Sequence, residues 1–345
     1  MAAVQLVFDG HNDAITRDDH AELVEGRPNG HLDLPRMRAG GVRGAIFAVF
    51  APSPDLSWEL VARDDGVQEV APAPPVAFAD AAALATRAAG RLLALERRGQ
   101  LRIARTGADL DRARDEPDGP PAAVLHLEGA EAIDPELEAL DLWHAAGLRS
   151  LGPVWSRSNA FGHGVPFIAP SSPDTGPGLT SVGQALVARC GELGIVIDLS
   201  HLNEAGFWDV ARADVGPLVA SHSGAHALCA SARNLTDRQL DAIAASGGLV
   251  GIVYACRFLR EDFADDPDTP LELIARHAAY VAERIGPEHV ALGSDFDGAT
   301  VPTALGDVAG VPRLLDALRA AGFGADELAA IAWDNWRRVL GAWWD

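Results

Sequence analysis

The 345-residue sequence contains no lysine, so arginine supplies all 28 basic side chains. This absence excludes Schiff-base catalysis by a lysine amine, a phosphate-binding loop that ends in Gly-Lys, and a metal pair bridged by a modified lysine. The 49 aspartates and glutamates outnumber the basic residues and give a formal net charge of −21. Because nucleic-acid binding depends on a basic surface, this charge argues against a nucleic acid as partner.

Long apolar runs and paired cysteines are also missing. No stretch approaches the roughly 18–20 uninterrupted apolar residues of a membrane-spanning helix. The first residues, Met-Ala-Ala-Val-Gln, lack the basic start and the apolar segment of a signal peptide. The three cysteines, Cys190, Cys229 and Cys256, show no paired spacing, which favours a reducing compartment. We therefore expect a cytoplasmic protein with no membrane partner.

Short apolar runs recur along the chain, and stretches rich in alanine and leucine separate them. The runs expected to be strands are residues 5–9, 43–50, 122–127, 148–154, 195–199, 217–220, 249–254 and 290–293. The stretches expected to be helices include residues 80–98, 135–146, 181–193, 270–285 and 326–340. This alternation predicts parallel β-α-β units. Eight such units predict an α/β fold in which residues 1–345 form a single domain, a (β/α)8 TIM-type barrel closed by the last helix.

Two segments are expected to be irregular. Residues 63–75 include the run Ala-Pro-Ala-Pro-Pro and predict a surface loop. Residues 156–178, after the fourth predicted strand, hold four glycines and four prolines, too many breakers for regular structure. Because the loops at the carboxyl ends of barrel strands surround the active site, we expect a long active-site loop after the fourth strand.

Five of the predicted strands are followed by carboxylate or imidazole side chains. The residues concerned are His11 and Asp13, Glu128, His201, His222, and Asp295. His11 and Asp13 have i, i+2 spacing, which places both side chains on one face of an extended chain. Any one of these strand ends taken alone could be a cap or a turn. Since the carboxyl ends of barrel strands meet at one rim, the whole set is expected to converge there.

The types of side chain in this set indicate a metal centre. Imidazole nitrogens beside carboxylate oxygens suit zinc. The expected ligands are His11, Asp13, Glu128, His201 and His222. They exceed what one tetrahedral zinc accepts, so the set predicts two cations that share Glu128. Charge supports this count, because two divalent ions would balance Asp13, Glu128, Asp295 and a bridging hydroxide.

The motifs that carry these residues resemble the renal (membrane) dipeptidase family of metallopeptidases, which have an amidohydrolase-like barrel. The matching pieces are Asp-Gly-His-Asn-Asp (9–13), Leu-Glu-Gly (127–129), Ile-Asp-Leu-Ser-His (197–201), Ser-His-Ser (221–223) and Gly-Ser-Asp-Phe-Asp-Gly (293–298). They occur in the family's order over nearly the whole chain. The resemblance implies a dipeptidase with two zinc ions, bridged by Glu128 and a hydroxide, that tolerates a D-residue at the C-terminal position. It also implies a possible homodimer.

The resemblance assigns roles to individual residues. It makes the five residues above the metal ligands, Asp295 the general acid and base, and Arg233 the residue that binds the substrate carboxylate, for which a guanidinium fork is well suited. Trp155 stands where the family has a histidine that contacts the scissile carbonyl. A Val-Tyr pair ending at Tyr254 replaces the family's Asn-Phe. Trp155 and Tyr254 are therefore expected to contact the substrate, and His163 could supply the missing imidazole from the loop.

These departures leave the substrate open. A related dinuclear amidohydrolase could act on N-acyl amino acids, modified dipeptides or β-lactams. A different class of protein, a metal-bearing binding protein without turnover, has no evident need for an intact Asp295. His126, which precedes Glu128 by two residues, is expected to contact the metal ligands rather than the metal itself. His226 and Asp297 are expected to be structural.

Overall fold

The computed structural model describes residues 5–345, so the first four residues of the N-terminal segment lie outside the described part. Parallel strands form its centre. They are β1 (Val7–Asn12), β2 (Val42–Phe50), β6 (Ala122–Glu128), β7 (Leu148–Gly152), β9 (Val196–Ile197), β10 (Val219–Ser223), β11 (Leu249–Ile252) and β12 (Val290–Leu292). Each overlaps one of the apolar runs predicted to be strands. β1 continues to Asn12, so His11 lies within the strand rather than after it.

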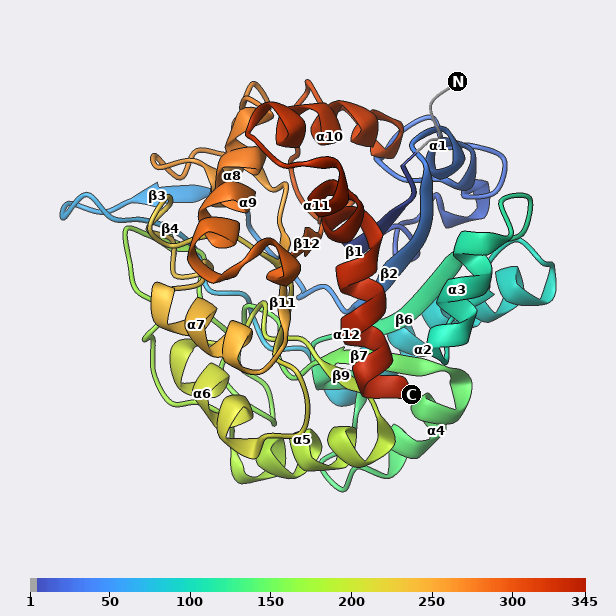
Figure 1. Ribbon diagram of the computed structural model, residues 1–345. Coiled ribbons are helices and arrows are strands. Elements are labelled where there is room, and N and C mark those ends of the chain that lie inside the picture. The colour runs from blue at the N-terminus through green and yellow to red at the C-terminus, as the bar shows by residue number, and fades with distance from the viewer. Residues whose placement is uncertain (1–4) are drawn as a thin grey trace.

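The parallel strands form two sheets that continue into each other. The first has the order β1-β2-β6-β7-β9, with the short β5 (Arg102–Ile103) beside β6, and the second has the order β10-β11-β12. Single parallel bridges link Asp198 to Val219 and Asn12 to Phe296. The protein is thus an α/β fold with a curled parallel sheet, consistent with a TIM-like barrel (Figure 1).

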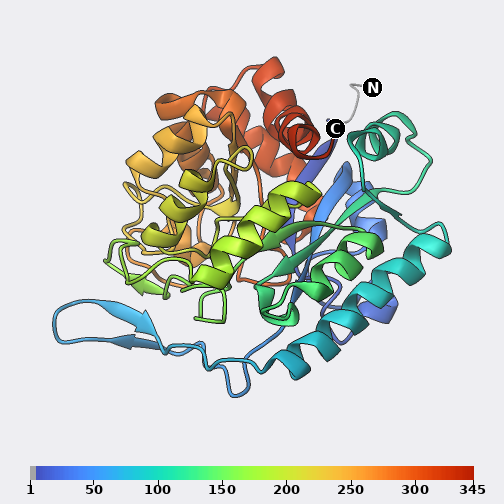
Figure 2. The ribbon, with the colours of Figure 1, turned by 90° about the horizontal axis from the view of Figure 1, so that it is seen from below.

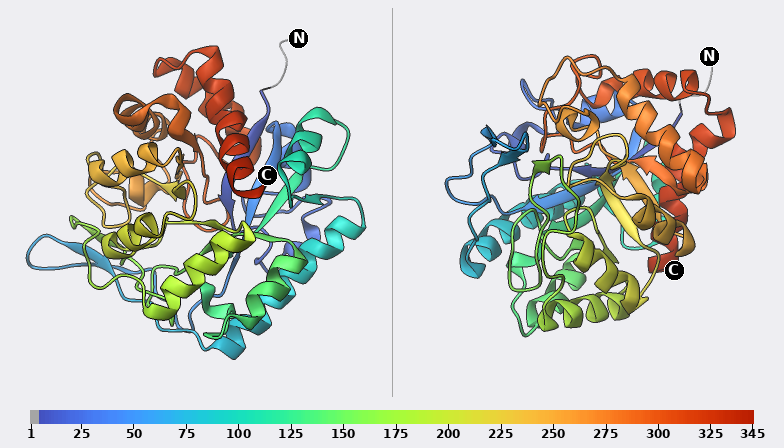
Figure 3. Two further views of the ribbon diagram at one scale, coloured as in Figure 1. Left: turned by 60° about the horizontal axis from the view of Figure 1, so that its bottom comes forward. Right: turned by 90° about the vertical axis from the view of Figure 1, so that its left-hand side faces the viewer.

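Most of the helices surround the strands, and the C-terminal ones cross over one end of them (Figures 1 and 3). The helices are α1 (Leu34–Ala39), α2 (Phe78–Arg97), α3 (Gly107–Asp115), α4 (Glu138–Ala146), α5 (Ser181–Leu193), α6 (Glu204–Ala213), α7 (Asp237–Ala245), α8 (Cys256–Leu259), α9 (Glu272–Ile285), α10 (Val311–Ala320), α11 (Ala325–Ala329) and α12 (Asn335–Trp344). Short 3-10 turns are η1 (His20–Glu22), η2 (Ala130–Ala132), η3 (Pro287–His289) and η4 (Val308–Gly310), and a π-helical turn, η5 (Ala330–Asp334), joins α11 to α12. Within residues 5–345, no helix combines the length and the apolar composition that crossing a bilayer requires.

The C-terminal helical run covers the amino ends of the strands. The helix expected at residues 326–340 is present and continues to Trp344. Trp336 is fully buried, lies 5.5 Å from Phe8 between ring centroids, and donates a hydrogen bond from Nε1 to the carbonyl oxygen of Leu292 at 2.9 Å. Together with Trp333 it belongs to an apolar cluster that also contains the first buried residues of several strands. This packing leaves the opposite, carboxyl end of the sheet for the site.

Two predicted loops contain short strands. In residues 63–75, β4 (Gln68–Val70) pairs with β3 (Leu60–Ala62) in a hairpin that projects from the body of the protein (Figure 2). Its turn places Gly66 at a φ of +83°, a conformation that favours glycine. In residues 156–178, β8 (Ile168–Ala169) pairs with β4. Strands of two or three residues are too short to show an alternating pattern in the sequence.

Gly10 in β1 lies close to Trp336 and to the backbones of two other strands. Substitution by a larger residue is therefore predicted to cause a packing defect. A β-carbon at Gly10 would overlap Cζ2 of Trp336 and lie 2.7 Å from the carbonyl oxygen of Ser221 and 2.8 Å from that of Leu292. Since two of these atoms belong to the backbone of neighbouring strands, Gly10→Ala should lower the free energy of unfolding by about 1–3 kcal/mol. Chemical denaturation measures the loss.

The matched control is Gly90→Ala in α2, where a β-carbon would meet no heavy atom of residues 5–345 within 4 Å. Because alanine favours a helix over glycine, this variant should gain about 0.5–1 kcal/mol. Equal stabilities for the two variants would contradict the packing account.

Candidate metal centre and substrate pocket

Side chains from separate strands meet at the carboxyl end of the sheet. His11 and His222 lie in β1 and β10, Glu128 is the last residue of β6, and Asp13, His201 and Asp295 follow β1, β9 and β12. One oxygen of Glu128, Oε1, lies 2.9 Å from Nε2 of His201. The same oxygen lies 3.4 Å from Nε2 of His11 and 3.4 Å from Nε2 of His222. A single carboxylate oxygen is therefore shared by three imidazoles.

Glu128 belongs to two groups of possible ligands. The ligand atoms of His11, Asp13 and Glu128 lie within 4.8 Å of one another, and so do those of Glu128, His201 and His222. A third group of the same compactness joins Asp295 to His11 and His222. The structure thus brings together all six residues that follow or end the predicted strands, with Glu128 at the centre.

Several polar atoms in this cluster lack partners. Among the described residues, nothing forms a hydrogen bond with either ring nitrogen of His11 or with Oδ1 of Asp13, although all three atoms are buried. A buried polar atom left unpaired costs about 1–3 kcal/mol. Cations would bind these atoms and would also offset the nearby carboxylates. The residues present therefore fit a metal centre.

The carboxyl groups of the cluster are shifted towards their protonated forms. Burial, and then the neighbouring charge of Asp295, raises the pKa of Asp13 well above its usual value. Burial and the charge of Asp13 do the same for the pKa of Glu128. Burial raises the pKa of Asp295 to about 7, against the opposing charge of Arg233. Three acidic groups so close together are electrostatically unfavourable unless cations accompany them.

The histidines of the cluster are neutral and held in orientation. Burial lowers the pKa values of His11, His201 and His222 well below the usual value. Nδ1 of His201 lies 2.8 Å from Oγ of Ser156, and Nδ1 of His222 lies 2.7 Å from Oγ of Ser221. These contacts leave the Nε2 atoms directed at the centre, as a metal-binding imidazole requires.

Asp198 organises a polar network beneath the histidines, a role that the sequence analysis missed. Its carboxylate accepts hydrogen bonds from Oγ of Ser200 at 2.6 Å and from the backbone N–H of Ser221 at 2.9 Å. His126 lies in the same network, with Nδ1 2.9 Å from Oγ of Ser150 and Nε2 3.8 Å from Oδ2 of Asp198. The Asp-Leu-Ser-His motif contained the available signal, because its aspartate precedes the candidate ligand His201 by three residues.

A buried ion pair anchors the loop that carries Asp295. Asp295 and Asp297 both adopt left-handed backbone conformations, with φ values of +60° and +69°. Asp297 accepts a hydrogen bond from Nη1 of Arg27 at 2.9 Å and from the backbone N–H of His31 at 2.6 Å. The side chains of Arg27 and Asp297 are fully buried. Asp297 thus braces the turn as expected, whereas Arg27, an isolated arginine, had no sequence signal.

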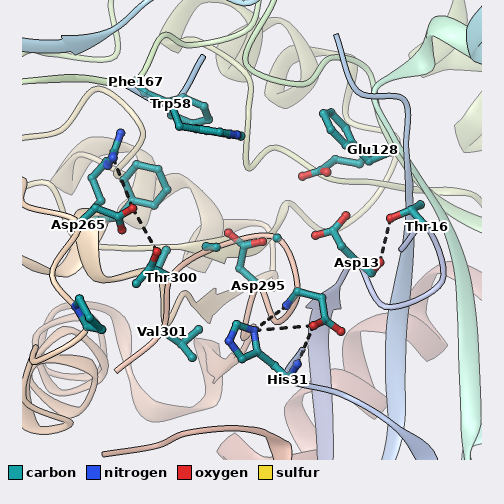
Figure 4. Close-up of a pocket in the computed structure, with 18 of the residues that line it drawn as sticks. Asp13, Thr16, His31, Trp58, Glu128, Phe167, Asp265, Asp295, Thr300 and Val301 are labelled. Carbon is teal, nitrogen blue, oxygen red and sulfur yellow. Dashed lines mark hydrogen bonds and ion pairs between the residues drawn. The ribbon is translucent and has the colours of Figure 1, made fainter. Parts of the chain in front are cut away.

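An open pocket of about 830 Å³ leads to this cluster, and Asp13, Glu128 and Asp295 form part of its floor. Its aromatic lining consists of Phe50, Trp58, Trp155, Phe167 and Phe258. Its polar lining includes Thr16, Arg17, His31, Arg257, Asp265, Asp297 and Thr300. Figure 4 shows Trp58 and Phe167 together at one side of the pocket, with Asp13 and Asp295 between them and His31.

Two of the predicted substrate-binding residues lie beside the histidines. Trp155 lines the pocket, and its ring centroid is 5.8 Å from that of His201. Arg233 is buried, with Nη2 3.2 Å from Nε2 of His201, and the same nitrogen donates a hydrogen bond to the carbonyl oxygen of His222 at 2.9 Å. Burial lowers the pKa of Arg233 to about 10.

Arg233 does not belong to the pocket lining in the described part of the chain, and the other candidates lie apart from the pocket. Tyr254 is buried, its ring packs 5.6 Å from that of Phe296, and it does not belong to the pocket lining in the described part of the chain. His163 is not part of that lining either, and its Nδ1 lies 2.9 Å from Oγ of Ser158. His226 has a structural contact, since its Nε2 lies 2.8 Å from the carbonyl oxygen of Ser171.

The chain matches the family model described as membrane dipeptidase (peptidase family M19) over residues 1–343. An uncharacterized protein of Klebsiella pneumoniae, from the pqqA 5′ region, is 51% identical over 246 residues, which cover 71% of this chain and 90% of that protein. The crystal structure of dipeptidase AC, an M19 metallopeptidase, is 45% identical, with a TM-score of 0.91 and coverage of 99% of this chain and 100% of that chain. A metallopeptidase from Rhodobacter sphaeroides, liganded with a phosphinate mimic of L-Ala-D-Ala, is 44% identical with the same TM-score and coverage.

The raised pKa of Asp295 predicts how Asp295→Asn changes the stability of the metal-free protein. The folded-state pKa of about 7 exceeds the value near 3.9 of an unfolded chain, so the stability contributed by this group is present at low pH and is lost as the pH rises through this interval. Asparagine resembles the protonated acid and does not titrate. Chelator-treated Asp295→Asn should therefore melt at a higher temperature than the chelator-treated parent protein, by a margin that grows from pH 5 to pH 8.

Chelator-treated Asp295→Asn and the chelator-treated parent protein contain the same buried histidines. The contributions of these histidines to the pH dependence of stability therefore cancel in the difference between the two melting temperatures. Asp316→Asn, on the exposed side of α10, provides a control whose melting difference should stay constant over the same range. A margin that shrinks with rising pH would contradict the raised pKa. Differential scanning calorimetry of the three proteins measures these differences.

Proposed function

Because the chain belongs to the membrane dipeptidase family of metallopeptidases (peptidase family M19), we propose that it is a zinc-dependent dipeptidase that accepts a D-residue at the C-terminal position. The observation that carries this proposal is the convergence of His11, His201 and His222 on one oxygen of Glu128 at 2.9–3.4 Å. The phosphinate mimic of L-Ala-D-Ala held by the Rhodobacter sphaeroides relative supports the D-residue.

The residues of the cluster divide into two sets that would each hold one zinc ion. His11, Asp13 and Glu128 form one set, and Glu128 with His201 and His222 forms the other. Neutral imidazoles and carboxylates are suitable ligands for zinc. When bound, such a pair of ions acidifies a shared water and polarises the peptide carbonyl. The raised carboxyl pKa values support two ions, because a single divalent charge would leave the carboxylates of the cluster only partly balanced.

Asp295 is proposed to move the proton during hydrolysis. It lines the pocket, and its ligand atom lies within 4.8 Å of those of His11 and His222. Its backbone N–H donates to the carbonyl oxygen of His11 at 3.0 Å, which couples its position to the first ligand strand. From there its carboxylate can accept a proton from the attacking water and return it to the leaving amine.

Arg233 is proposed to bind the carboxylate at the end of the substrate. Its Nη1 donates to Oγ of Ser223 at 2.9 Å, while its Nε is buried and forms no hydrogen bond with the described residues. The guanidinium therefore retains a donor beside the metal-binding histidines. Trp155, which occupies the position of the family histidine, would then border the scissile bond as an apolar surface.

The remaining predictions concern architecture and location. The two parallel bridges at Asn12 and Asp198 support a closed (β/α)8 barrel, which we propose as a single domain. Phe167, which lines the pocket, supports the predicted active-site loop in residues 156–178. Substrate contact by Tyr254, a homodimer and a cytoplasmic location stay predictions from the sequence.

Hydrolysis of dipeptides by the zinc-loaded protein tests the proposed function. Release of free amino acid from L-Ala-D-Ala and L-Ala-L-Ala should occur with zinc and stop with a chelator. Asp295→Asn should retain its metal while kcat falls by about 10²–10⁴-fold, the usual contribution of a general acid and base. Undiminished hydrolysis by Asp295→Asn would remove this residue from the mechanism. Hydrolysis of N-acyl amino acids or β-lactams without any dipeptide hydrolysis would instead favour a different amidohydrolase. If the protein binds metal but hydrolyses none of these compounds, it is a binding protein.

Metal analysis tests the shared glutamate. The protein prepared with zinc should contain about two ions per chain, and Glu128→Gln should lose affinity for both because it removes the common charged ligand. Glu136→Gln, an exposed substitution in the segment that follows, should retain both ions. A fully active protein with one ion per chain would rule out the dinuclear arrangement.

A further inference from the structure

We propose that the pocket selects dipeptides whose N-terminal residue has a bulky aromatic side chain, and that Trp58 forms the outer part of its binding surface. We call Phe50, Trp58, Trp155, Phe167 and Phe258 the aromatic wall. The inference rests on the proposed function for the bond that is cleaved, and it adds the class of substrate.

The aromatic wall is a continuous surface built from distant segments. The ring centroid of Trp155 lies 4.8 Å from that of Phe50, 6.0 Å from that of Trp58 and 5.5 Å from that of Phe167. Phe167 in turn lies 5.6 Å from both Trp58 and Phe258. These residues come from β2, the segment before β3, the segments after β7 and before β8, and α8. Offset and edge-to-face arrangements at these distances stabilise aromatic clusters and present ring faces to a ligand.

Trp58 differs from its neighbours in exposure. Its side chain is 49% exposed, whereas Trp155 and Phe167 are 5% and 9% exposed. The exposed large apolar side chains of the described chain are Trp58, Val61, Phe78 and Leu142. Of these four, Trp58 alone lines the pocket. An exposed tryptophan that borders a pocket offers apolar area that a ligand can bury.

The inner part of the aromatic wall is fixed before any substrate binds. The guanidinium carbon of Arg157 lies 5.3 Å from the ring centroid of Phe50 and 5.2 Å from that of Trp155. Arg157 is itself buried, donating from Nε to Oε1 of Glu131 at 2.8 Å and from Nη2 to the carbonyl oxygen of Ala51 at 2.8 Å. Because the rings are held by this ion pair, little ordering is needed when a side chain packs on them.

The position of the aromatic wall relative to Arg233 indicates which residue of the substrate it contacts. The guanidinium carbon of Arg233 lies 5.6 Å from the ring centroid of Phe258, so that end of the wall adjoins the proposed carboxylate site. Phe167 comes next, 5.6 Å from Phe258 between ring centroids, and it contacts Trp155, which lies beside His201 of the metal centre. Trp58 contacts both Phe167 and Trp155, and Phe50 contacts Trp155, so neither ring adjoins Phe258 directly and both lie farther from Arg233 along the wall. A dipeptide with its carboxylate at Arg233 would therefore place its N-terminal side chain on Trp58.

The size and the opposite side of the pocket agree with this assignment. The volume of about 830 Å³ lies within the range of pockets that enclose ligands much larger than two alanines. Across the pocket from Trp58 and Phe167 lie His31 and Val301 (Figure 4), and the phenyl and indole rings of the lining all belong to the aromatic wall. A large aromatic surface of this kind discriminates by the area that a substrate buries.

Three matched substrates and three variants test the inference. We expect kcat/KM of the zinc-loaded protein to be at least about tenfold higher for L-Phe-D-Ala than for L-Ala-D-Ala, and L-Ala-D-Phe should gain much less. Trp58→Ala should reduce the preference for L-Phe-D-Ala by about tenfold, chiefly through KM, and Trp58→Phe should restore most of it. Val61→Ala is the control, because Val61 lies in β3, just after the segment that carries Trp58, and is equally exposed but does not line the pocket. It should leave all three values unchanged.

The outcomes separate this inference from the proposed function. Hydrolysis of all three dipeptides at similar rates would overturn the inference and leave the dipeptidase intact. A preference for L-Phe-D-Ala that survives Trp58→Ala would overturn the assignment to Trp58, and a stronger preference for L-Ala-D-Phe would overturn the assignment to the N-terminal residue. Failure to hydrolyse any of the three would overturn both proposals.

Discussion

The constraint on which the rest of the site depends is the burial of several carboxylates beside one another. Asp13, Glu128 and Asp295 lie at the floor of one pocket, and burial raises the pKa of each. Neutral histidines cannot offset their charge. The arrangement is stable as an ionised cluster only when cations accompany it, so the free energy of metal binding becomes part of the free energy of folding at this end of the sheet. The Asp198 network and the Arg27 ion pair then act as the framework that keeps the candidate ligands in place.

How much of this could be predicted from the sequence depends on where the interacting partners lie. The convergence of the candidate ligands could be predicted because each ends or closely follows an apolar run, and the carboxyl ends of parallel strands meet in space. Arg27 could not, since its partner Asp297 lies 270 residues away and neither position has a local pattern. The wall residues Phe50 and Phe167 were missed for the same reason. The resemblance to the family placed Tyr254 at a position expected to contact the substrate. In the structure its ring packs against Phe296, away from the pocket, and this side-chain direction had no signal in the sequence.

The absence of lysine has a counterpart in the structure, where buried arginines connect segments that are distant in sequence. Arg27 donates to Asp19, Asp297 and the carbonyl oxygens of Ala14 and Leu32. Arg157 bridges in the same way between Glu131, Ser53 and Ala51. A guanidinium has five donors in a fixed plane, so one side chain can hold several loops at once, whereas an ammonium group has no such planar fork. Both arginines lie next to the pocket lining, at the turn of Asp297 and behind Trp155.

The pairing of the first strand with the segment after the last has a consequence for synthesis of the protein in the cell. The backbone carbonyl oxygen of His11 accepts a hydrogen bond from Oγ of Ser294, and the two residues are 283 positions apart. At roughly 5–20 residues per second, a ribosome that has released β1 needs about 15–60 s more to supply its partner. During that time the first strand has an unpaired edge and its two ligand side chains have no complete site. Assembly of this cluster of side chains is therefore a late event that follows translation of the segment around Ser294, and until then the edge of β1 is open to pairing with other chains.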